Sequence, residues 1–217
     1  KDYAGAIKDF SSSLELKPGN AEAYTGRGNA KVTQKDYAGA IQDFSKAIEL
    51  NPASAVAFLG RGNARFTLKD NNGALQDFNK VITLQPTNSN VYFNVGVIYG
   101  NENKSQEAIR AFRQYSALEP AEWHGYKNTA DIYYLQLANP DSSALYYGKA
   151  FQLKKDDKEI IERYGYSLLK QKKVNEAIAM FKNQLTLLPD DPWGYYNIAC
   201  AYSIGKQYND AISYLSR

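Results

Sequence analysis

Two short glycine-rich segments, Gly26-Arg27-Gly28 and Gly60-Arg61-Gly62, are the places in this chain where phosphate chemistry could be sought. A glycine loop binds phosphate when it follows a strand and opens a helix, because its backbone N–H groups then point at the ligand. Both segments instead fall inside expected helices, with no strand before them. We therefore expect these glycines to allow close helix packing and to bind no nucleotide.

Cysteine and histidine chemistry is limited to one residue of each type, Cys200 and His124. A cysteine nucleophile needs a base beside it, and no histidine follows Cys200, so we expect a small, partly buried thiol. A single cysteine forms no disulfide within the chain, and a single histidine removes most metal-binding and general-base arrangements. We expect His124 at the surface or in a groove, with a partner contact as the alternative. The sequence therefore predicts no enzyme, no metal site and no cofactor.

The elements that carry these residues are set by a repeat of 34 residues. Prolines mark it at Pro18, Pro52, Pro86, Pro120 and Pro189, with Lys155 where one more would stand. Series of small and aromatic residues that start at Ala6, Phe10 and Gly28 keep the same spacing. A fixed period of this length predicts a repeat architecture.

One repeat, from Ala21 to Ser54, shows what its parts do. Apolar residues three and four apart predict helices over residues 21–34 and 37–50. Asp36 is expected to cap the second helix, and Asn51-Pro52 to end it, because proline excludes the residue before it from the α region. Small residues lie where the two helices cross, so we expect Ala40 and Ala108 to be buried.

The order of aromatic, Gly, Ala, aromatic and Pro positions resembles the tetratricopeptide repeat, and the resemblance covers essentially the whole chain. It implies an all-α, right-handed superhelical solenoid of helical hairpins, each touching only its neighbours. In two repeats, basic residues replace apolar ones of the family pattern: Arg27, Lys31, Arg61 and Arg65. We expect their stems to pack and their charged heads to lie in water.

The predicted organisation is a single array. It has a lone second helix in residues 1–20, complete repeats at 21–54, 55–88, 89–122, 123–157 and 158–191, and a partial repeat at 192–217. Because the chain starts and stops inside a repeat and without a starting Met, we interpret it as a fragment of a longer protein, and its compartment stays open. Uncapped ends predict weak self-association.

The repeat at 123–157 is irregular. It has an extra residue near Leu135–Asp141, and Lys155 replaces the terminal proline. Asn139 is expected to cap its second helix, and Asp156 or Asp157 to cap the next one. Two interpretations stay open: drift in a tolerant loop, or a functional bend between two halves.

By the resemblance, ligands of the family lie on a concave face formed by the first helices, at the second, fifth, ninth and twelfth positions of each repeat. Exposed apolar and aromatic clusters favour partner binding, although some of these side chains could pack against the next repeat. The predicted partner-binding groove comprises Leu59, Asn63, Phe66, Phe93, Asn94, Val97, Tyr134, Tyr166, Leu169, Trp193 and Tyr196.

A carboxylate clamp, as in chaperone-binding members of the family, is not expected. Asn63 and Asn94 match its amides, but Leu59, His124 and Asn128 stand where it needs cations. Two amides without cations cannot balance a carboxylate well.

The charge balance, with 26 basic and 23 acidic residues, gives no positive field of the kind that nucleic-acid binding requires. No stretch is long and apolar enough to span a membrane, so we expect no membrane contact by this segment. The sequence thus predicts a non-catalytic protein–protein interaction scaffold that binds a peptide or protein segment along its concave face. The alternative is a self-association or spacer module of a larger multidomain protein.

Overall fold

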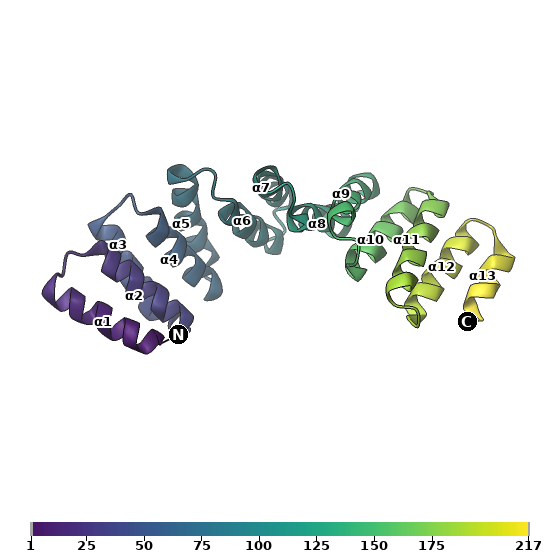
Figure 1. The fold of residues 1–217 in the computed structure, drawn as a ribbon. Coiled ribbons are helices and arrows are strands. Elements are labelled where there is room, and N and C mark those ends of the chain that lie inside the picture. Colours follow the sequence, from purple (N-terminus) through teal and green to yellow (C-terminus); the bar gives the residue numbers. More distant parts are fainter. Residues whose placement is uncertain (1, 217) are drawn as a thin grey trace. The chain divides into compact units, whose positions relative to one another are not determined.

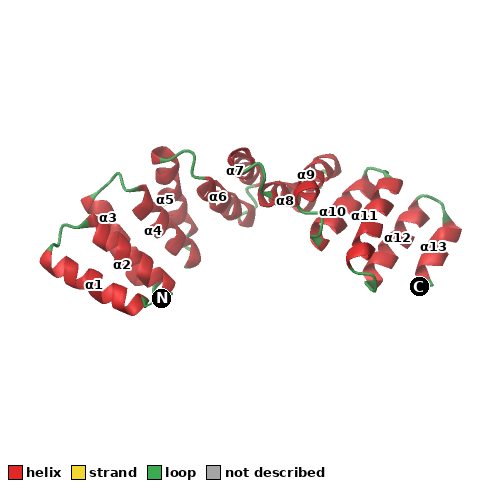
Figure 2. Ribbon diagram, viewed as in Figure 1, coloured by secondary structure: helices red, strands yellow, loops and turns green. Residues whose placement is uncertain are grey.

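The computed structural model describes residues 2–216, and every regular element within them is a helix (Figures 1 and 2). The elements are α1 (Tyr3–Leu16), α2 (Ala21–Thr33), α3 (Tyr37–Leu50), α4 (Ala55–Thr67), α5 (Asn71–Leu84), α6 (Ser89–Asn101), α7 (Ser105–Leu118), α8 (Trp123–Asp131), the π-helical turn η1 (Ile132–Gln136), α9 (Pro140–Leu153), α10 (Lys158–Lys170), α11 (Val174–Leu187), α12 (Pro192–Ile204) and α13 (Tyr208–Leu215). From α2 on, the helices form successive hairpins. The predicted all-α array of helical hairpins is confirmed.

The chain divides into two compact units, one ending at Ile98 and the other beginning at Tyr99, so that the boundary falls within α6. The first unit contains α1 to α5 and most of α6. The second contains the end of α6 and all later helices. In each unit, helices that follow one another in sequence pack together, for example α2 on α3 and α10 on α11.

The link between the two helices of a hairpin is fixed by backbone hydrogen bonds. At the end of α2, the Lys35 N–H donates to Val32 O at 2.9 Å and the Asp36 N–H to Lys31 O at 2.9 Å. This pair of bonds defines a Schellman motif, which places one residue in the left-handed region. Lys35 takes that role, with φ 64°. Asp36 then caps α3, as predicted, by accepting from the Gly39 N–H at 2.9 Å.

In three of the hairpins, α2–α3, α4–α5 and α10–α11, an aromatic ring packs on a glycine of the first helix. A Cβ added at Gly28 would come within 2.8 Å of the Phe44 ring, so only glycine fits there. Phe44 itself is fully buried, and so are Ala40 and Ala108 at the helix crossings, as predicted. Because a small residue brings the helices together, the aromatic ring can fill the space beside the contact without leaving a void.

The expectation that the basic residues of the first repeats keep their charges in water is wrong. Arg61 donates through Nε and Nη2 to both carboxylate oxygens of Asp77, at 3.0 and 2.7 Å, and Arg65 Nη1 donates to the same carboxylate at 2.8 Å. The repeat before it has the same arrangement around Asp43, which pairs with Arg27 and Lys31. A buried carboxylate needs a charged partner, so the heads turn inward toward it.

The irregular repeat absorbs its extra residue inside the first helix. The Leu137 N–H donates to Ile132 O, five residues back, at 3.1 Å, which is the bond of a π-helical turn. Asn139 then caps α9 by accepting from the Ser142 N–H, as predicted. Asp157 caps α10 through the Ile160 N–H, as one of the two predicted alternatives. The prediction of a bend stays open.

Candidate functional site

The first helices of successive hairpins contact one another through one recurring pair of positions. The ninth residue of one repeat bonds the sixth residue of the next. In the first unit, Asn94 Nδ2 on α6 donates to Asn63 Oδ1 on α4 at 3.0 Å. In the second unit, the Tyr166 hydroxyl on α10 donates to Asn197 Oδ1 on α12 at 2.8 Å. We call the surface that these helices form in each unit its first-helix face.

The first-helix face of the first unit is almost uncharged. Asn63 is exposed there, and Asn94 is half-buried. The apolar members of the predicted groove in this unit are also half-buried: Leu59, Phe66, Phe93 and Val97. A cleft of about 420 Å³ between α2 and α4 adds Thr25, Asn29 and exposed Val56, with Glu22 as its one charged side chain among the described residues. This surface offers apolar contacts and amide hydrogen bonds.

On the second unit, three predicted groove residues are half-buried and partly serve the core. Tyr166 lies 5.5 Å from the Phe181 ring between ring centroids, and Leu169 packs on the same cluster of buried residues. Burial raises the pKa of the Tyr166 hydroxyl. Tyr134, on the π-helical turn, lies 4.5 Å beneath the Lys170 ammonium. These side chains therefore present only part of their surface to a ligand.

Trp193 and Tyr196, near the start of α12, are far more open. Trp193 is 62% exposed and Tyr196 is 51% exposed. Their rings meet edge to face, with centroids 5.8 Å apart and an interplanar angle of 87°. Large aromatic side chains left in water on a rigid helix are a common feature of binding surfaces.

A charged network that was not predicted joins the first helices α8 and α10, which precede α12 in the second unit. Lys127 on α8 donates to Asp131 at 2.8 Å and to Glu159 at 2.8 Å. Arg163 on α10 also pairs with both acids, and Tyr147 on α9 donates its hydroxyl to Asp131. Burial lowers the pKa of the Arg163 guanidinium, but Asp131 and Tyr147 together outweigh it, so the pKa is raised. Arg163 is therefore a fixed cation.

A second charged cluster lies at the start of α12. Lys158 Nζ is 2.9 Å from Asp191 and 3.7 Å from Glu162. The buried amide of Gln184 donates to the same two carboxylates at 2.7 and 2.8 Å. Asp191 caps α12 by accepting from the backbone N–H of Trp193 at 3.3 Å, so this cluster and the exposed aromatic pair lie at the same end of α12.

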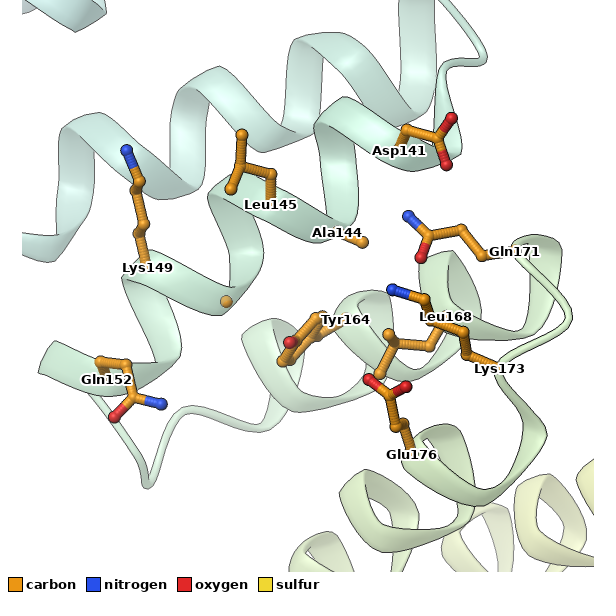
Figure 3. A pocket seen from close by; sticks show the side chains of 11 residues that line it. Asp141, Ala144, Leu145, Lys149, Gln152, Tyr164, Leu168, Gln171, Lys173 and Glu176 are labelled. Carbon is orange, nitrogen blue, oxygen red and sulfur yellow. The ribbon is translucent and has the colours of Figure 1, made fainter.

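A separate cleft of about 440 Å³ lies between the second helices α9 and α11, with α10 as its floor (Figure 3). Gly148 opens it, because a Cβ there would lie 3.1 Å from the Tyr164 hydroxyl. Glu176 reaches from α11 toward Tyr164, and Lys173 lies beside it. Burial, followed by the Glu176 charge, raises the pKa of Tyr164. The lining mixes both charges with apolar side chains and favours no one ligand.

Other chemistry finds no geometric support within residues 2–216. No group of three or more His, Cys, Asp or Glu side chains there is placed to hold a metal ion. No helix of the described residues has the length and apolar character needed to cross a membrane. Cys200 is a half-buried free thiol on α12, and His124 is half-buried at the start of α8 with its ring stacked on Trp123.

Three sequence models described as tetratricopeptide repeat match the chain, over residues 21–54, 55–88 and 78–110. A comparison with curated protein sequences gives no match. The C-terminal part of a TPR repeat-containing protein from Cytophaga hutchinsonii has a TM-score of 0.81 at 15% identity, over 98% of this chain and 88% of that one.

Two further solved structures are similar. MamA has a TM-score of 0.71 at 22% identity, over 77% of this chain and 91% of that chain. YrrB, described as a TPR protein with an unusual peptide-binding site, has a TM-score of 0.70 at 21% identity, over 80% of this chain and 89% of its own. At these identities the likeness shows a shared fold.

Proposed function

Because the chain belongs to the tetratricopeptide repeat family, we propose that it is a non-catalytic protein–protein interaction scaffold. Its ligand is a protein or peptide segment that lies along the first-helix faces, on the concave side that the family resemblance implies. The mechanism is rigid presentation: stacked helices fix the side chains in advance, so that binding costs little ordering of the scaffold.

The observation that carries this proposal is the exposure of Trp193 and Tyr196. Both project from the start of one helix, and their rings brace each other edge to face. An aromatic side chain usually buries roughly 150–250 Å² of surface when it packs. Trp193 and Tyr196 have much of that surface still available for a partner. The description of YrrB as peptide-binding supports the same use of the fold.

Peptide selection followed by calorimetry tests the proposal. A random twelve-residue peptide library is panned on the protein, and selected peptides are titrated into the protein and its variants. Phe66→Ala, Phe93→Ala or Trp193→Ala should weaken binding by about 1 kcal/mol or more, at an unchanged helical signal. Leu145→Ala is the control, because Leu145 is about as exposed as Trp193 but lies on the second helix α9. Binding that ignores all three variants would contradict the proposal.

The alternative, a self-association module, is favoured by one surface. Tyr208, Ile212 and Leu215 on α13 are each more than half exposed, which leaves one side of that helix apolar and uncovered. Light scattering over a range of concentrations separates the two functions. A monomer at all concentrations favours the scaffold, whereas a mass that rises with concentration and falls in Ile212→Asp favours self-association.

A further inference from the structure

The edge of the second unit where α8, α10 and α12 begin carries a surplus of acidic side chains. Residues 122–131, 154–163 and 190–193 contain eight carboxylates and five lysines or arginines. The surplus is local, because residues 99–217 as a whole contain fifteen basic and fourteen acidic side chains. The three helix N-termini there each contribute about half a positive charge, which offsets only part of the surplus.

Four of the five cations at this edge are already paired with acids of the chain, and Lys155 is the exception. Lys127 and Arg163 both lie between Asp131 and Glu159, and Lys158 lies between Glu162 and Asp191. They are therefore not free to receive an acidic ligand. Glu159 keeps 47% of its side chain exposed, so one face of its carboxylate stays open to solvent.

The exposed aromatic pair lies at the same edge. Asp191 is common to both features, since its carboxylate pairs with Lys158 and accepts from the backbone N–H of Trp193. Asp190, the residue before it, is exposed and lines a shallow cleft of about 350 Å³ with Lys158 and Pro189. An indole ring is the strongest cation–π acceptor among the side chains, and nearby carboxylates add to its attraction for a cation.

We propose that the partner segment held by the second unit is basic, with an Arg or Lys side chain that lies over the Trp193 ring and faces the open carboxylates of Glu159 and Asp190. This inference rests on the proposed function, since it presumes that the first-helix face binds a protein segment. An acidic segment would meet the surplus of carboxylates, and Lys127, Lys158 and Arg163 already have acidic partners. An uncharged segment would leave that surplus without a counterpart.

The first unit supplies an internal contrast. Its first-helix face has the same positions but is lined by Val56, Leu59 and Phe93, with Glu22 as the charged residue of its cleft. The two faces therefore differ in the chemistry that they offer. Only the partner segment on the second unit is therefore expected to be basic. The first-helix face of the first unit suits an apolar segment.

The test uses the peptides selected from the random library on the whole chain. Peptides that depend on Trp193 should be enriched in Arg and Lys. Replacing the key Arg by citrulline, its neutral isostere, should weaken binding about 3- to 30-fold at 50 mM salt, with a smaller effect at 300 mM salt. Trp193→Phe should keep part of this preference, and Trp193→Leu should lose it while retaining apolar area.

Glu159→Gln provides a second variant that leaves Trp193 in place, and it should reduce the Arg-over-citrulline preference by itself. Leu145→Ala should leave the preference unchanged. Selected peptides that need Trp193 but show no basic excess, or bind equally well with citrulline, overturn the basic partner and leave the scaffold intact. Peptides whose binding is weakened only by Phe66→Ala and Phe93→Ala also overturn the basic partner and leave the scaffold intact. A library that yields no binder, or binders indifferent to every first-helix variant, overturns the inference and the proposed function together.

Discussion

Arg61 holds Asp77 in a two-bonded ion pair inside the first unit, with Nε and Nη2 at 3.0 and 2.7 Å from the two carboxylate oxygens. Only 2% of Asp77 is exposed, and Arg65 adds a third bond from 2.8 Å. The pair joins the two helices of one hairpin, α4 and α5. Arg61 Nη1 also reaches Ser45 on α3 at 3.1 Å, so it couples two repeats.

Removing one side of this pair should be costly. Asp77→Ala leaves the mostly buried guanidinium groups of Arg61 and Arg65 without this carboxylate, and we expect a loss of about 3–5 kcal/mol in the free energy of unfolding. Urea denaturation followed by circular dichroism measures it. Asp70→Ala is a control on the same hairpin, where loss of a mostly exposed cap should cost only about 0.5–2 kcal/mol. Equal costs for the two variants would mean that the buried pair is not a special contact.

Replacing the whole network should be far less costly than breaking it. The next repeat has Val95, Tyr99 and Ala111 at the positions of Arg61, Arg65 and Asp77. A triple variant that copies these residues restores an apolar packing that the chain already uses. We expect it to be more stable than Asp77→Ala, because buried ion pairs are often matched by well-packed apolar groups. A triple variant as unstable as the single one would show that the network sets the helix positions.

The left-handed residues at the hairpin links predict a gain in stability. Lys172, between α10 and α11, has φ 63°, a conformation that costs a residue with a Cβ roughly 1–2 kcal/mol. Glycine adopts it without strain but loses more entropy on folding, so Lys172→Gly should stabilise by about 0.5–1 kcal/mol. Lys172→Val should destabilise. Thermal melts of both variants decide the matter, and a destabilising Lys172→Gly would contradict the strain argument.

The hairpin links were predictable from the sequence only in part. The period and the caps at Asp36 and Asn139 followed from residue types alone. The left-handed residue did not, because lysine at that position carries no signature of the Schellman motif, whereas glycine would have. The extra residue of the irregular repeat was expected near the loop. A π-helical turn absorbs it instead, because Leu137 can bond the carbonyl five residues back without breaking the helix.

Acid should weaken the second unit through Asp191. The hydrogen bond from Lys158 holds the pKa of this carboxyl below its usual range. A folded-state pKa below the unfolded one gives stability that is present above about pH 4 and is lost as the pH falls through the folded value. Urea melts between pH 6 and pH 2.5 should therefore show a steeper decline for the wild type than for Asp191→Asn. Asp210→Asn, at an exposed site on α13, is the control, and parallel declines for wild type and Asp191→Asn would refute the linkage.

Overpacking tests the helix crossings. Ala108 on α7 is fully buried, so Ala108→Leu has no room and should cost about 1–3 kcal/mol. Ala117→Leu, at an exposed position of the same helix, should be close to neutral. Denaturant midpoints of the two variants give the comparison. A neutral Ala108→Leu would place the crossing elsewhere.

The site was predictable only in part. Positions in the repeat identified Trp193 and Tyr196 as groove residues, and both are exposed. The pairing of Asp131 with Arg163 was not predicted, although it joins the same ninth and sixth positions as Asn63 with Asn94, because the pattern within one repeat does not say which side chains bond across to the next. The degree of burial of Tyr166 also depends on a neighbour, Phe181, that no local pattern identifies. The groove as a whole stays a prediction.

Photo-crosslinking of a selected peptide tests the central claim most directly. A benzophenone group placed along the peptide marks the residues that it touches, and mass spectrometry identifies them. Binding along the first-helix faces predicts crosslinks to α4 and α6 for a peptide held by the first unit, and to α10 and α12 for a peptide held by the second unit, with those at α12 lost in Trp193→Ala. Crosslinks confined to the second helices, above all to α9 and α11 around the cleft at Tyr164, would contradict the account.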